Sequence, residues 1–122
     1  MRLKLFIVLA ALCLLPVSCS KSVVLSVDAT ITFHCTDGYD RKFGPATYEG
    51  FGGRHLKSGD IYAMFDDLRL KLNENKDYDF STATMYLDVY DKISDDFLYS
   101  EAYEFYKVDG HKRRGYEYRS LN

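Results

Sequence analysis

Apolar and polar residues alternate over long stretches of the chain after position 20. Within Lys21–Cys35 every second residue from Val23 onward is apolar, and polar residues fill almost all the positions between them. Successive side chains of a β-strand point to opposite faces of its sheet, so this period predicts a long strand with one buried face. The in-phase apolar positions are Val23, Leu25, Val27, Ala29, Ile31, Phe33 and Cys35.

The second half of the chain repeats this pattern. Residues 82–90 alternate in the same way, and Phe97–Val108 predicts another long strand. Asp109 and Gly110 form a dipeptide typical of tight hairpin turns, which leads into a last predicted strand over 112–120. The sequence therefore predicts a mainly β fold built from antiparallel sheet.

Residues 61–72 fit two different elements. Five apolar residues lie on one helical face: Ile61, Met64, Phe65, Leu68 and Leu72. Residues 68–72, however, alternate with the period of a strand. Leu72 and Tyr78 flank a polar turn and resemble the tyrosine corner of immunoglobulin-like and fibronectin-type domains. This resemblance implies two short strands and an immunoglobulin-like β-sandwich; the alternative is an α+β fold with one helix over about 59–72 on a four-stranded antiparallel sheet.

The first 18 residues have the composition of an export signal. Arg2 and Lys4 precede Leu5–Leu15, an uninterrupted apolar run of 11 residues. As a helix this run would be about 16 Å long, whereas the hydrocarbon core of a bilayer is about 30 Å thick. The pattern predicts a secretory signal peptide over 1–18 and a single exported β-rich domain over 19–122.

The end of this segment resembles the lipobox of bacterial lipoprotein precursors. Residues 14–20 read LLPVSCS, in which Ser18 is the small residue before Cys19, while Pro16 stands where the box usually has Leu. The resemblance implies a lipid on Cys19 that anchors the protein to a membrane of the cell envelope. The alternative is cleavage near Ser20, which would release a secreted or periplasmic protein.

The cysteine count and the charge indicate what stabilises the mature chain and which partners it can bind. With Cys13 removed and Cys19 lipidated, Cys35 is the last thiol, so a packed core rather than a disulfide must stabilise the domain. The whole chain has a formal charge of −2, and loss of Arg2 and Lys4 leaves 14 basic and 18 acidic residues. This charge excludes a polybasic nucleic-acid binder, and we expect no nucleic-acid partner.

No catalytic motif is found along the chain. His34 and Cys35 are neighbours on a predicted strand, so their side chains point to opposite faces. His55 is distant in sequence, and the three histidines lack the spacing of a zinc site. We therefore expect that the protein is not an enzyme and has no cofactor. If the protein were an enzyme, the candidate catalytic residues would be His34, His55 and the aspartates described next.

Four aspartates crowd the end of one predicted strand and the following turn: Asp88, Asp91, Asp95 and Asp96. Carboxylate oxygens converging from a loop can hold Ca²⁺. The stretch resembles a calcium loop of C2 domains, with Lys92 in place of that pattern's second aspartate. The other interpretation is that these are solvated acids of a turn.

Tyrosines recur at alternate positions of the later strands: Tyr86, Tyr90, Tyr99, Tyr103, Tyr116 and Tyr118. If these strands pair in order, a tyrosine-lined sheet face results, which would be either a surface for a protein or glycan partner or core beneath a second layer. The basic residues 112–114 are typical of an edge strand protected against aggregation. The predicted function is an exported envelope lipoprotein that acts by binding, with a secreted inhibitor or immunity-type protein as the alternative.

Overall fold

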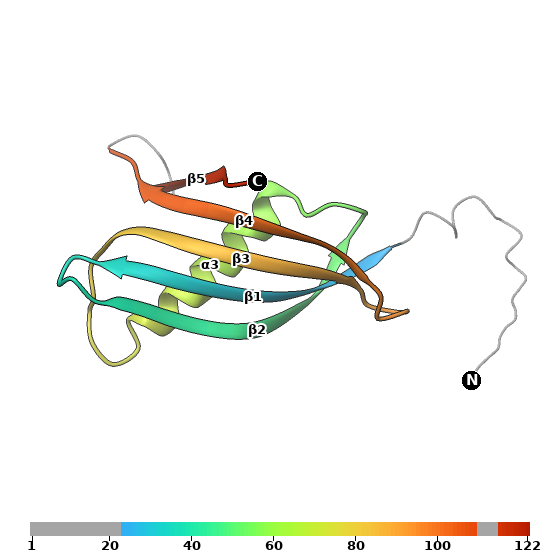
Figure 1. The fold of residues 1–122 in the computed structure, drawn as a ribbon, viewed down its shortest axis with the longest axis horizontal. Coiled ribbons are helices and arrows are strands. Elements are labelled where there is room, and N and C mark those ends of the chain that lie inside the picture. Colours follow the sequence, from blue (N-terminus) through green and yellow to red (C-terminus); the bar gives the residue numbers. More distant parts are fainter. Residues whose placement is uncertain (1–22, 110–114) are drawn as a thin grey trace, which may run out of the picture.

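The computed structural model describes residues 23–109 and 115–122, which form five strands and one helix (Figure 1). The elements are β1 (Val24–Cys35), β2 (Asp40–Gly52), α3 (Ser58–Leu72), β3 (Phe80–Asp91), β4 (Phe97–Lys107) and β5 (Tyr116–Ser120). The expected signal peptide, Cys19, Gly110 and the basic residues 112–114 lie outside the described residues.

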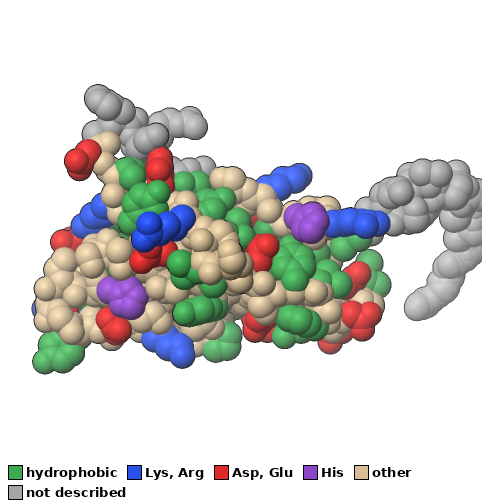
Figure 2. All heavy atoms as spheres, turned by 45° about the horizontal axis from the view of Figure 1, so that its top comes forward, with side chains coloured by type: hydrophobic (Ala, Val, Ile, Leu, Met, Phe, Trp, Pro, Cys, Tyr) green, Lys and Arg blue, Asp and Glu red, His purple; other side chains and the backbone are tan. Residues whose placement is uncertain are grey.

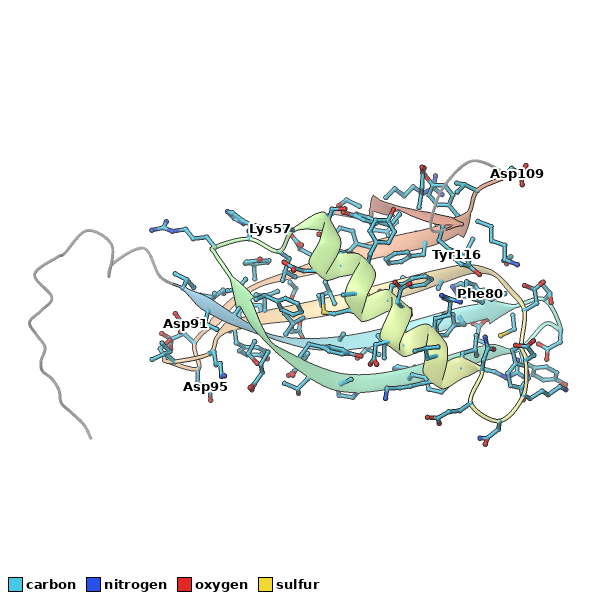
Figure 3. The ribbon with its side chains drawn as sticks, turned by 180° about the vertical axis from the view of Figure 1, so that it is seen from behind. Lys57, Phe80, Asp91, Asp95, Asp109 and Tyr116 are labelled. Atoms are coloured by element: carbon cyan, nitrogen blue, oxygen red, sulfur yellow. The ribbon has the colours of Figure 1, made fainter. Side chains whose placement is uncertain are left out.

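The strands form one antiparallel sheet in the order β2-β1-β3-β4-β5. The helix connects the edge strand β2 to the central strand β3 and lies diagonally across one face of the sheet (Figures 1 and 3). The prediction of a mainly β, antiparallel fold is confirmed. In the described part of the chain the second layer is the helix α3, as in the α+β alternative, on five strands rather than four.

Residues 61–72 belong to the helix, so the interpretation as two short strands is wrong. The five apolar residues of the predicted helical face are all buried, whereas Leu70 is 66% exposed. The first turn is closed by a hydrogen bond from the Lys57 backbone N–H to Asp60 Oδ2 at 2.9 Å. Because Leu72 ends a helix and not a strand, the tyrosine corner does not form; the Tyr78 ring instead lies 3.8 Å from the Arg41 guanidinium.

The hydrophobic core lies between α3 and the sheet. All in-phase apolar residues of β1 from Leu25 to Cys35 are buried, together with their neighbours on β3. Aromatic rings join the two layers: Phe65 of the helix stacks on Phe105 of β4 with ring centroids 3.9 Å apart. Within the sheet, the ring of Phe33 of β1 packs edge-on against that of Phe80 of β3, with ring centroids 4.9 Å apart. The alternating pattern of the sequence thus marks the face that the helix covers.

The helix α3 has 15 residues, and no helix among residues 23–109 and 115–122 is long and apolar enough to cross a membrane.

Candidate binding surface

The face of the sheet turned away from α3 is uncovered in the described chain, and we call it the open face. Figure 1 views the molecule from this side, with the helix behind the strands, and Figure 2 shows it obliquely, with hydrophobic, acidic and basic side chains interspersed on the surface. The polar residues that alternate with the core residues of β1 and β3 point to this face. The open face is therefore the part of the sheet that is free to meet a partner.

Two tyrosines and an aspartate form a line along the centre of the open face. Tyr86, Asp88 and Tyr90 occupy alternate positions of β3, and Tyr86 is 55% exposed. We call this line the Tyr–Asp–Tyr stripe. On the neighbouring strand β1, Thr30 and Ser26 lie opposite the two tyrosines.

A second carboxylate lies directly opposite the centre of the stripe. Asp28 of β1 pairs with Asp88 of β3. Side chains in this arrangement have Cβ atoms about 4.5–5.5 Å apart, and like charges placed there repel each other. Two acids at this spacing in the middle of a sheet reduce stability unless another group offsets their charge.

Hydroxyl groups from the outer strands satisfy part of this acid pair. Thr47 Oγ1 donates to Asp28 Oδ1 at 2.8 Å, and Ser100 Oγ donates to Asp88 Oδ1 at 2.5 Å. Neither carboxylate has a salt bridge to a lysine or arginine of the described chain. The hydroxyls orient the two carboxylates but leave their negative charges in place.

One end of the stripe opens into an acidic hollow of about 370 Å³. Its walls are formed by Ser26, Asp28, Thr47, Glu49, Tyr90 and Asp95. Glu49 is paired there with Lys92, whose Nζ lies 3.4 Å from Glu49 Oε1. Through Asp95 the hollow extends the negative charge of the stripe toward the β3–β4 turn.

The four aspartates considered for calcium are not brought together. Asp91 Oδ1 accepts the backbone N–H groups of Ile93 and Ser94 at 2.9 and 3.1 Å, so it stabilises the turn. Asp95, with φ of 67°, lines the acidic hollow, while Asp88 belongs to the stripe. Asp96 accepts the Asp91 N–H through its backbone carbonyl at 2.9 Å. Among the described residues no three metal-ligating side chains are grouped as a metal site.

The six tyrosines expected to line one face of the sheet are divided between its two faces, so they form no single tyrosine-lined face. Tyr86 and Tyr90 lie on the open face, whereas the other four lie on the helix-covered face: Tyr99, Tyr103, Tyr116 and Tyr118. The cause is the register of the sheet, which pairs Val89 with Tyr99 and Phe105 with Tyr118.

The covered tyrosines are part of the packing around α3. Tyr103 is 8% exposed, and its hydroxyl donates to Glu101. Burial and that carboxylate raise the pKa of Tyr103. Tyr116 stacks on Phe80 at 5.4 Å, and Tyr118 packs edge-on against Tyr103 at 5.1 Å. These rings therefore act as core.

The candidate catalytic residues are separated. His34 Nδ1 lies 3.0 Å from Asp40 Oδ1 and its Nε2 lies 3.2 Å from Thr84 Oγ1, near the end of β1. Cys35 is buried on the other face. His55 lies in the β2–α3 connection, with its ring 6.0 Å from that of Tyr99.

Sequence reasoning did not single out Asp28, which completes the site. The alternation of β1 showed that Asp28 lies on the polar face, but its place in the site depends on the strand that pairs with β1. Comparison with known proteins identifies no relative, since no family model, no curated protein and no solved structure matches the chain.

Proposed function

We propose that this protein is an exported, lipid-anchored envelope protein that binds a basic segment of a partner protein on its open face. The observation that carries the binding proposal is the Tyr–Asp–Tyr stripe with Asp28 opposite its central aspartate. Export and the lipid anchor rest on residues 1–18 and on the lipobox-like sequence around Cys19.

A lysine or arginine side chain matches the chemistry of the stripe. Its charge would form charge-assisted hydrogen bonds with Asp88 and Asp28 and would offset their repulsion. The rings of Tyr86 and Tyr90 flank this position and offer cation–π contact, which contributes about 0.5–1 kcal/mol at exposed sites. The arrangement therefore favours a cationic group over a neutral or anionic one.

The surroundings of the stripe extend this preference to a segment with several basic residues. The acidic hollow next to Tyr90 adds Asp95, whereas Glu49 in the same hollow is paired with Lys92. On the far side of the stripe, Glu104 pairs with Arg119 of β5, so that part of the face is neutral. A basic segment lying along β3 toward the β3–β4 turn would meet the further carboxylate of Asp95.

Photo-cross-linking in the producing cells tests this proposal. A benzophenone-bearing amino acid replaces Tyr86 in one variant and Tyr39 in a second, because Tyr39 is 69% exposed but lies in the β1–β2 turn. We expect a discrete adduct with one partner protein from position 86 and none from position 39. Equal adducts from both positions, or none from position 86, would contradict the proposal.

Charge variants test the basic character of the partner. Asp28→Asn and Asp88→Asn keep the shape and the hydroxyl contacts, and each should reduce the position-86 adduct several-fold. Glu74→Gln removes the same charge from an exposed residue after α3 and should leave the adduct unchanged. If the captured partner is an enzyme whose activity falls on binding, the protein is an inhibitor or immunity-type protein acting through the same face.

A further inference from the structure

We propose that the end of the sheet at which β1 begins is a membrane-contacting surface that rests in the headgroup region of the bilayer. This anchor end consists of Val23, the β2–α3 connection over 53–57 and the β3–β4 turn over 91–98. The inference rests on the lipid anchor of the proposed function and adds an orientation of the domain on the membrane.

Backbone hydrogen bonds join the three parts of the anchor end. The Lys92 N–H donates to the Val24 carbonyl at 2.8 Å, and the Gly53 N–H donates to the Val23 carbonyl at 3.0 Å. In Figure 3 the labelled residues Asp91 and Asp95 lie near the point at which the described chain begins, and Lys57 lies at the same end of the molecule, beside the start of the helix. The turn and the connection are thus held beside the start of β1.

The length of chain between the lipid and the sheet keeps this end near the bilayer. Cys19 is four residues before Val23, the first described residue. An extended chain spans at most about 3.6 Å per residue, so four residues reach about 14 Å. A lipid on Cys19 would hold the anchor end within that distance of its acyl chains.

Large apolar side chains are exposed at this end. Ile93 at the tip of the turn is 82% exposed, and Phe97 and Leu98 are 57% and 42% exposed. A register irregularity between β3 and β4 lies at these residues, because Val89 pairs with Tyr99 but Tyr90 pairs with Phe97. The other large exposed apolar residues of the described chain lie outside the anchor end: Tyr39, Leu70, Tyr86 and Leu121.

A groove of about 330 Å³ at this end has Leu98 in its wall. It is lined by Val23, Arg54, His55, Asp91, Leu98 and Tyr99. Apolar and amphipathic groups such as these fit the boundary between headgroups and acyl chains, where aromatic rings and long cationic side chains keep their polar ends in water.

The charges of the anchor end nearly cancel. Arg54, Lys57 and Lys92 stand against Asp91, Asp95 and Asp96. Anionic lipid therefore gains little attraction, and apolar contact rather than charge determines the depth of the surface. The proposal therefore requires that the anchor end contacts a zwitterionic bilayer as well as an anionic one.

Tryptophan fluorescence tests the orientation, because the chain contains no Trp. Full-length Ile93→Trp, Leu70→Trp and Tyr39→Trp variants are produced in the native host and placed in phosphatidylcholine vesicles with and without brominated acyl chains. We expect the Ile93→Trp emission to shift to shorter wavelength and to be quenched several-fold more than that of the other two. Adding phosphatidylglycerol should change this quenching little.

Flotation with the vesicles and intact-mass measurement separate the anchor from the contact. Lipidated, floating protein whose Ile93→Trp fluorescence is not quenched overturns the membrane-contacting surface and leaves the anchor intact. Protein without a lipid mass overturns both. A blue shift of Ile93→Trp that appears without vesicles in a Cys19→Ser background, and grows with protein concentration, shows contact with a second copy and also overturns the proposal.

Discussion

The two faces of the central strands β1 and β3 are built from the same backbone but have opposite chemistry. On the covered face, residues of both strands are fully buried against α3 and aromatic rings stack across the layers. On the open face, the pairing of the same strands brings Asp28 against Asp88 and leaves Tyr86 in solvent. Burial on one face stabilises the sheet, which allows the other face to keep an arrangement that costs stability.

The comparison separates two uses of aromatic residues. Phe65 and Phe105 are inaccessible to solvent and join the layers, whereas Tyr86 is 55% exposed on the open face and Tyr90 is half-buried there, edge-on against Phe97. A substitution on the covered face should therefore lower the free energy of unfolding, and a substitution on the open face should change binding with little loss of stability.

The largest effect is expected at the centre of the covered face. Phe65→Ala should lower the free energy of unfolding by about 3–5 kcal/mol, because it removes a fully buried ring and leaves a cavity under Phe105. Urea unfolding followed by circular dichroism measures this loss. Leu70→Ala on the exposed side of the same helix is the control and should stay within about 0.5 kcal/mol. Similar losses for the two variants would contradict the helix orientation.

A smaller difference is expected between two tyrosine hydroxyls. Tyr103→Phe removes a hydrogen bond to Glu101 at a buried ring and should cost about 0.5–1.5 kcal/mol. The matched change Tyr86→Phe on the open face should leave the unfolding midpoint unchanged, since that ring is exposed. Equal costs at both positions would mean that the two faces do not differ as described.

Removing one charge of the acid pair should raise the free energy of unfolding, whereas the preceding substitutions of buried residues should lower it. Asp88→Asn removes the repulsion with Asp28 and keeps an acceptor for Ser100, so we expect a gain in stability of about 0.2–1 kcal/mol. The gain should shrink in high salt, which screens exposed charges. Unfolding at low and high ionic strength measures it. A loss of stability would show that the carboxylate at this position is structural and not kept for binding.

The smallest effect concerns pH at the rim of the covered face. Asp79 pairs with Lys107, and this hydrogen bond holds the pKa of the Asp79 carboxyl below its usual value of 3.8. A carboxyl with a lowered folded-state pKa adds stability above its unfolded pKa and loses that contribution as pH falls through the folded value. Asp79→Asn should therefore slightly flatten the loss of stability below about pH 4, as measured by unfolding midpoints across this range. An unchanged acid profile would show that the pair contributes nothing.

The buried residues of a single element could be predicted from the sequence, because they follow from the periodicity of that element. The alternation in β1 marked every residue of its buried face, and the five apolar positions of the helical face are those that α3 buries. The choice between helix and strands for 61–72 could not be made locally, because residues 68–72 alternate while lying on a helix whose Leu70 points to solvent.

The sequence alone determined which residues of each strand share a face, since that follows from the two-residue period of extended backbone. Only the tertiary structure decided which strands are neighbours and in which register. That choice sent Tyr99, Tyr103, Tyr116 and Tyr118 under the helix and placed Asp28 beside Asp88. The pairing of Asp28 with Asp88 joins residues 60 positions apart in the sequence, and a one-residue shift in any strand would have exchanged its side chains between the faces.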